Sequence, residues 1–334
     1  MTRTRRLLPI LALALPAAFI IAYSAWWYWL AERWPAALAR WTDSLAARGW
    51  HVETGAVSVS GWPGPLRIAL AQPKASDTAG DSWEGPPIAL VVSPFAPLAP
   101  RMAAPGSHKV ALAGRPAAEI TTASLEGQVA VWDGAPVSGW LTAKTTAGLG
   151  LTADGLMIEV RRLAPPADGQ TGAVLAATVE LDRLTMPATP RLPFDRTLSS
   201  AHLALRLRGM VPPGPLREAL AAWRDAGGAV ELDSLDLNWP PLTAAGSATV
   251  ALDTNLQPEM AGGFTLRGAG QAIDRAGEAG MIDPSAAIVA KLALGLAATK
   301  AGDGQPEVKV GISIQDRILS IGPVQLGLIP EVIW

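Results

Sequence analysis

From residue 51 to residue 334, apolar and polar side chains alternate along the chain with a period of two. This alternation is typical of antiparallel β-strands that bury one face and expose the other. The 33 glycines and 29 prolines argue against a mostly helical chain, because both residue types disfavour helix interiors. The pattern predicts a mostly β fold: a long curved antiparallel sheet, half-barrel or groove-like, with a few covering helices. The clearest strands are residues 65–72, 201–208, 247–253, 260–267 and 308–314.

Three segments of this region carry helical signals instead, and one of them, residues 271–281, contains the helix-disfavouring Gly277 and Gly280. Residues 213–226 place apolar side chains on one side and end at a pair of glycines. Residues 284–300 follow Asp283, a residue type suited to an N-cap, and carry an apolar stripe that as a rule faces a core. The stripe consists of Ile288, Leu292 and Leu296.

Near the N-terminus, residues 7–30 form a run of 24 residues without a charge. At 1.5 Å per residue, such a run can span a hydrocarbon core of about 30 Å. Arg3, Arg5 and Arg6 precede it, so the positive-inside rule predicts a cytoplasmic N-terminus and export of everything after residue 30. The small residues Ala22 and Ser24, at the spacing of a cleavage site, leave a cleaved signal peptide as an alternative. We favour an uncleaved anchor, because the apolar run continues past that point.

Aromatic residues crowd the exit end of this run, where amphipathic rings suit the membrane–water interface. The predicted membrane-interface residues are Trp26, Trp27, Tyr28, Trp29 and Trp34. The expected segments are a cytoplasmic basic tip (1–6), a transmembrane helix as anchor (7–30), an amphipathic helix (31–50) and a periplasmic antiparallel β domain (51–334). The amphipathic helix could be a stalk on the membrane or a cover for one end of the sheet. The expected location is a bacterial inner membrane, crossed once.

Three groups of short motifs carry a family resemblance. They are residues 57–63 before the strand at 66–70, residues 235–240 followed by 246–253 and 256–258, and residues 319–324 with 329–330. In this order, and with the N-terminal anchor, they resemble a bacterial family of exported, membrane-anchored proteins known only as a domain of unknown function. Their rhythm is loosely similar to AsmA-like envelope proteins. That similarity implies a curved sheet with an apolar inner face and a role in envelope lipid homeostasis, and it implies no catalytic residues.

The sequence contains few residues or motifs that are typical of catalytic or metal-binding sites. The chain has no cysteine and only three histidines, which lie far apart, so thiolate metal sites and cysteine nucleophiles are excluded. No phosphate-binding loop or nucleophile elbow occurs. The formal net charge of −2 comes without a basic patch, which argues against nucleic acid. Asp233 and Asp236 are paired carboxylates, but the alternation slips at Asp233-Ser234, which predicts a β-bulge. We expect no enzyme activity, no cofactor and no metal.

Two functional hypotheses remain. In the first, the apolar strand faces bind lipid or another apolar ligand; the candidate ligand face is Leu66, Ile68, Leu70, Val250, Leu252, Phe264 and Leu266. In the second, that face is a closed core, and the protein is a scaffold for envelope protein partners. Two loop motifs could pack the ends of the sheet, rim a groove or touch membrane. They are Gly61, Trp62 and Pro63, and Trp239 with Pro240.

Overall fold

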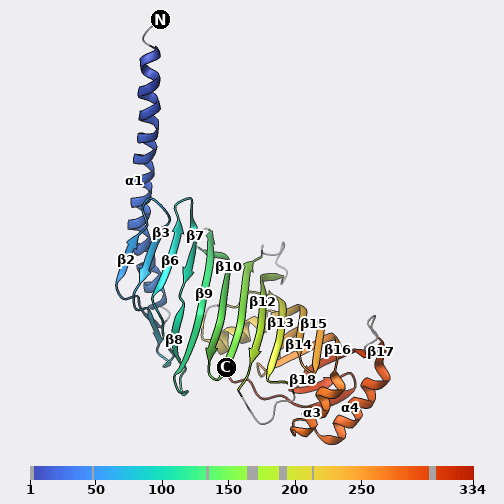
Figure 1. Ribbon diagram of the computed structural model, residues 1–334. Coiled ribbons are helices and arrows are strands. Elements are labelled where there is room, and N and C mark those ends of the chain that lie inside the picture. The colour runs from blue at the N-terminus through green and yellow to red at the C-terminus, as the bar shows by residue number, and fades with distance from the viewer. Residues whose placement is uncertain are drawn as a thin grey trace. The chain divides into compact units, whose positions relative to one another are not determined.

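The computed structural model describes residues 4–46, 49–132, 135–163, 172–187, 194–212, 214–300 and 306–334. The side chains of residues 4–14, 135 and 300 lie outside this description. The described residues form 20 strands and four helices (Figure 1). The strands pair antiparallel and the sheet is not closed, which confirms the predicted mostly β class. The chain divides into unit 1 (Met1–Pro136) and unit 2 (Val137–Trp334).

Unit 1 is a meander whose first four long strands are each interrupted near the middle, whereas the last, β9, is continuous. The consecutive segments β1 and β2 form one interrupted strand, in which β1 pairs with β4 and β2 pairs with β3. In the same way, β5 and β6 form one interrupted strand, in which β5 pairs with β8 and β6 pairs with β7. The interruptions align, because the backbone N–H of Ala71 bonds to the carbonyl of Ala56 and that of Gly85 bonds to the carbonyl of Pro73. Prolines cluster at these interruptions, since proline cannot donate to a strand ladder. The strands are β1 (Trp50–Glu53), β2 (Val57–Ser60), β3 (Leu66–Leu70), β4 (Lys74–Asp77), β5 (Ser82–Glu84), β6 (Ile88–Ser93), β7 (Ala96–Ala103), β8 (Gly106–Ala111) and β9 (Ala118–Trp132).

A single helix, α1 (Thr4–Ala46), runs without a break through the predicted anchor segment and most of the predicted amphipathic helix. The predicted end of that helix at residue 50 is wrong, because β1 begins at Trp50. Its middle part packs on the sheet of unit 1, where Trp27 joins Leu66, Ile68 and Val92 in a buried cluster. Trp34 and Leu38 pack against the same cluster, so this part of α1 covers the sheet. Among the residues that the structure describes, no helix combines the length and the apolar character needed to cross a bilayer.

Unit 2 is an up-and-down meander in which most strands pair with the next strand in sequence. The exception is β16, which pairs with β18 because α3, α4 and β17 intervene. The strands are β10 (Ala135–Gly148), β11 (Leu151–Arg162), β12 (Ala173–Thr185), β13 (Thr197–Arg208), β14 (Ala229–Trp239), β15 (Leu242–Leu252), β16 (Pro258–Arg267), β17 (Ala298–Lys300), β18 (Pro306–Gln315), β19 (Ile318–Ile321) and β20 (Val324–Leu328). The helices are α2 (Leu216–Asp225), α3 (Ala269–Glu278) and α4 (Pro284–Ala297).

The orientation of α4 differs from the sequence-based expectation. Ile288, Leu292 and Leu296, the predicted core-facing stripe, are exposed, whereas Ala290 and Leu294 are buried. The small side chain of Ala290 lets α4 approach the rest of the core of unit 2 closely. The predicted helix also ends three residues early, because β17 begins at Ala298 and pairs with β18.

The predicted N-cap of α4 is confirmed, and it should make the stability of this helix depend on pH. The Ser285 hydroxyl and the backbone N–H groups of Ser285 and Ala286 donate to the Asp283 carboxylate. These bonds favour the ionised form, so they lower the pKa of Asp283 below its ordinary value. The capping contribution is therefore fully present above the unfolded-state pKa, and it is lost as the pH falls through the folded-state pKa.

We expect the Asp283→Asn variant, which keeps an acceptor oxygen without a titrating carboxyl group, to lose this acid sensitivity. Hydrogen exchange of the peptide covering α4, followed over a series of acidic pH values and corrected for intrinsic exchange, measures the effect. An equal loss of protection in parent and variant would show that another group makes α4 acid-sensitive.

Candidate functional site

The strand register of unit 2 separates an apolar face from a polar face. Leu156, Leu181 and Ala201 lie directly opposite one another across β11, β12 and β13. The next row along the strands brings Glu180 opposite His202. Because side chains one residue apart point to opposite faces of a sheet, these two rows lie on different faces.

The apolar face is covered over one half of unit 2. There, α3, α4 and the last strands bury a cluster that includes Phe264, Leu266, Ile273 and Leu294. Residues Leu232, Leu235 and Leu237 of β14 pack at its margin. This half of the apolar face therefore forms part of the hydrophobic core of unit 2.

Over β11, β12 and β13 the same face is only half-buried. Its large aliphatic side chains belong to neither of the two buried clusters formed by the described residues. Strand and side-chain spacings give this area roughly 300 Å², which is the size at which an apolar patch often marks a binding surface. We call it the open apolar face; it consists of Leu156, Ile158, Val160, Val179, Leu181, Leu203, Leu205 and Leu207.

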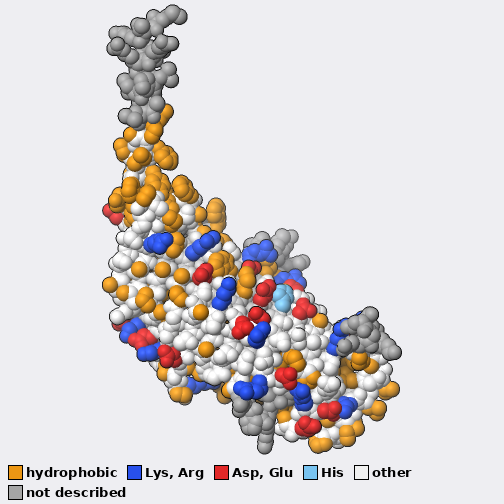
Figure 2. Space-filling view, viewed as in Figure 1, with side chains coloured by type: hydrophobic (Ala, Val, Ile, Leu, Met, Phe, Trp, Pro, Cys, Tyr) orange, Lys and Arg blue, Asp and Glu red, His pale blue; other side chains and the backbone are white. Residues whose placement is uncertain are grey.

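The polar face of unit 2 is hollowed. A concavity of about 710 Å³ extends across it from β10 to β18. Its lining carries both signs of charge, since Arg267 lies 3.3 Å from Glu307, and the His202 imidazole lies 3.8 Å from Glu180. Figure 2 shows Lys and Arg side chains mixed with Asp and Glu over the strands of unit 2. Within the described part of the chain, no group of three or more His, Asp or Glu side chains could hold a metal ion.

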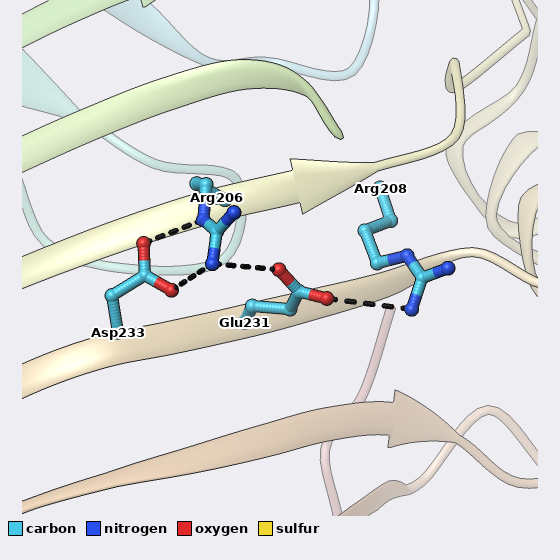
Figure 3. A network of polar contacts seen from close by, with 4 residues as sticks. All are labelled: Arg206, Arg208, Glu231 and Asp233. Atoms are coloured by element: carbon cyan, nitrogen blue, oxygen red, sulfur yellow. Dashed lines mark hydrogen bonds and ion pairs between the residues drawn. The ribbon is translucent and has the colours of Figure 1, made fainter. Parts of the chain in front are cut away.

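A network of ion pairs joins β13 and β14 (Figure 3). The Arg206 guanidinium donates to both oxygens of Asp233, at 2.6 and 2.5 Å, and lies 3.3 Å from Glu231, which also pairs with Arg208. The Asp233 carboxylate raises the pKa of Arg206. The predicted bulge is confirmed, since the register between β14 and β15 shifts between Leu232 and Leu235. Asp233 thus neutralises a cation at a bulge, which gives it a structural role.

The structure places most of the predicted ligand-face residues inside the two cores. Leu66, Ile68 and Leu70 are buried beneath α1. Phe264 and Leu266 are buried in the cluster formed with α3 and α4. Val250 and Leu252 are half-buried at one end of β15. The open apolar face was not among the candidate ligand residues, although residues 177–181 alternate clearly and Leu203, Leu205 and Leu207 lie in the predicted strand at 201–208.

The predicted membrane-interface residues divide into two groups. Trp27 is buried, and its indole N–H donates to the carbonyl of Gly64 at 2.9 Å, while Trp34 packs on the same core. Trp26, Tyr28 and Trp29 are exposed on the other sides of α1.

The two loop motifs also have different environments. Gly61 has a φ of +118°, and a Cβ there would lie 2.1 Å from the carbonyl oxygen of Pro65, so only glycine fits this turn. Trp62, next to Pro63, is exposed. Trp239, before Pro240, instead packs on Phe194, with ring centroids 4.4 Å apart, and its indole N–H donates to the carbonyl of Asp195.

These features describe an open-sheet β protein whose unit 2 has an apolar and a polar face, with a long N-terminal helix. Residues 27–330 match the model of a family described as uncharacterized protein conserved in bacteria (DUF2125). The chain belongs to this family. Comparison with curated proteins and with solved structures gave no match.

Proposed function

We propose that this protein is anchored in the bacterial inner membrane by α1 and binds lipid or another apolar ligand on the open apolar face of unit 2. The observation that carries the proposal is the row of half-buried aliphatic side chains on β11, β12 and β13, such as Leu181 and Leu203, which neither buried cluster of the described residues includes. A contiguous apolar surface of this size costs free energy in water and is a reason to expect an apolar partner.

The anchor is proposed from the N-terminal sequence. The charge-free run begins at Leu7, upstream of the described side chains, and three arginines precede it. These features favour an N-terminus in the cytoplasm and both units in the periplasm. α1 continues from this run into the core of unit 1, which favours a retained helix over a cleaved signal peptide.

The proposed role is non-enzymatic and needs no cofactor. The looser similarity to AsmA-like envelope proteins favours a part in envelope lipid homeostasis or assembly. The open sheet agrees with the groove that this similarity implies, because an unclosed sheet leaves an apolar face for acyl chains.

A second candidate is a periplasmic scaffold that binds envelope proteins. The burial of Leu66, Ile68, Phe264 and Leu266 in closed cores favours it. So do the charges of both signs that line the 710 Å³ concavity, since complementary charges favour specific protein partners.

Site-specific photo-crosslinking in cells tests the proposal. We expect a benzophenone amino acid at Leu203 to form lipid adducts, because this position lies on the open apolar face. Ala204 is the matched control: it is the next residue of β13, is also half-buried, and lies on the polar face. Mass spectrometry of the labelled peptide identifies the adduct. Phe19 on α1 serves as a positive control for contact with the bilayer.

Lipid adducts at 203 but not at 204 would support ligand binding on the open apolar face. Protein adducts at 203 or 204 without lipid would favour the scaffold. Lipid adducts at 19 with none at 203 would contradict lipid binding and leave the anchor in place.

A further inference from the structure

Two strand-connecting turns of unit 1 accept hydrogen bonds from side chains of α1 that lie within about one turn of that helix. The turn between β2 and β3 offers the carbonyl of Pro63 to the Tyr23 hydroxyl and that of Gly64 to the Trp27 indole. The turn between β6 and β7 offers the carbonyl of Pro94 to the Trp26 indole at 2.9 Å. Both turns are therefore fixed at one level of the helix.

The tips of these turns are apolar and exposed. Phe95 is 82% exposed and Trp62 is 49% exposed, and Leu98 follows on β7. Residues 61–66 and 88–100 contain no charged side chain. Figure 2 shows hydrophobic side chains gathered along α1 and over the adjoining end of unit 1.

The backbone of the tips is suited to a poorly hydrated environment. Pro63, Pro65, Pro94 and Pro97 have no N–H group to satisfy. The carbonyls of residues 63, 64 and 94 accept hydrogen bonds from side chains of α1, so they do not depend on water. Satisfied backbone groups of this kind are what a segment needs in order to enter lipid.

The position of the tips along α1 agrees with the edge of a bilayer. A hydrocarbon core of about 30 Å takes about 20 helical residues, and counting from Leu7 places its end near Trp26. Trp26 is the residue that bonds to the Pro94 turn. Tyr23, whose ring stacks on Phe95 with centroids 6.0 Å apart, lies about 4.5 Å closer to the bilayer centre.

We propose that the turns carrying Trp62 and Phe95 insert into the interfacial layer of the membrane in which α1 is anchored, so that this end of unit 1 rests on the lipid surface. The inference depends on the anchor described under Proposed function. The partner of these exposed turns is the phospholipid bilayer, because the apolar tips continue the exposed apolar surface of α1 at the level where that helix leaves the hydrocarbon core. Exposed aromatic side chains at that level match the rings typical of membrane interfaces.

The absence of cysteine allows each position to be labelled singly in the full-length chain. The variants Phe95→Cys, Trp62→Cys, Phe19→Cys and Ala79→Cys each receive an environment-sensitive fluorophore and are reconstituted into phosphatidylethanolamine–phosphatidylglycerol vesicles. Lipids carrying a nitroxide at a shallow or a deep acyl position then quench the label. Ala79 is the matched control, because it lies in the exposed turn between β4 and β5, at the opposite end of the same strands.

We expect strong quenching of the labels at 95 and 62 by the shallow nitroxide, strong quenching at 19 by the deeper one, and none at 79. A label at Leu98→Cys should lose its shallow quenching when Phe95→Asp is added, while circular dichroism shows an unchanged fold. Quenching at 19 without quenching at 95 and 62 would overturn the membrane contact and preserve the anchor. Absence of quenching at 19 would overturn the anchor, and the membrane contact with it.

Discussion

Replacing Trp27 with alanine is expected to destabilise unit 1 by about 3–5 kcal/mol, the usual cost of truncating a large buried aromatic side chain. Trp27 is only 4% exposed, and it packs with Leu66, Ile68 and Val92. Its indole N–H also holds the turn at Gly64, so truncation leaves a cavity and an unpaired carbonyl. Denaturant unfolding of the full-length protein in a mild detergent measures the loss.

Trp41→Ala is the matched control, because Trp41 lies on the same helix and is 55% exposed. We expect its effect to stay within about 0.5 kcal/mol, as for most surface substitutions. Equal stability of the two variants would show that α1 does not contribute to the fold of unit 1. A fragment beginning at residue 31 would lack two residues of this core, Trp27 and Leu30.

The strands could be predicted from the sequence because alternation is a local property. β3, β13, β16 and β18 all lie where the period of two predicts them, and the bulge at Asp233 follows from a slip in that period. The N-cap at Asp283 is equally local, since its partners are the next residues of the chain. Each of these features is decided by neighbours in sequence.

What covers each strand face could not be predicted, because it depends on contacts between distant segments. Leu66 and Leu203 lie in the same alternating pattern, yet α1 buries the first and neither described cluster includes the second. The same reason explains α4, where the stripe with the highest hydrophobicity faces outward and Ala290 faces the core. The period of the sequence shows which face of a strand or helix is apolar, but it does not show which distant segment of the chain covers that face.

The boundary between the covered and the open part of the apolar face in unit 2 can be tested at Phe264. We expect Phe264→Ala to destabilise unit 2 by about 3–5 kcal/mol, because this side chain is 7% exposed in the cluster formed with α3 and α4. Its ring lies over Gly246 and Gly262: a Cβ at either position would come within 2.6 and 2.8 Å of it, respectively. Neither glycine has a side chain to fill the cavity that truncation would leave.

Leu292→Ala is the control for this experiment, since Leu292 is on the exposed side of α4, at 65% exposure, and its truncation should cost less than about 1 kcal/mol. Thermal unfolding of the two full-length variants compares them. A neutral effect of Phe264→Ala would mean that α3 and α4 do not seal the sheet, so that the apolar face available to a ligand extends from β11 to β18. The expected large effect instead limits ligand binding to β11, β12 and β13, where Leu203 is the position at which lipid should be sought first.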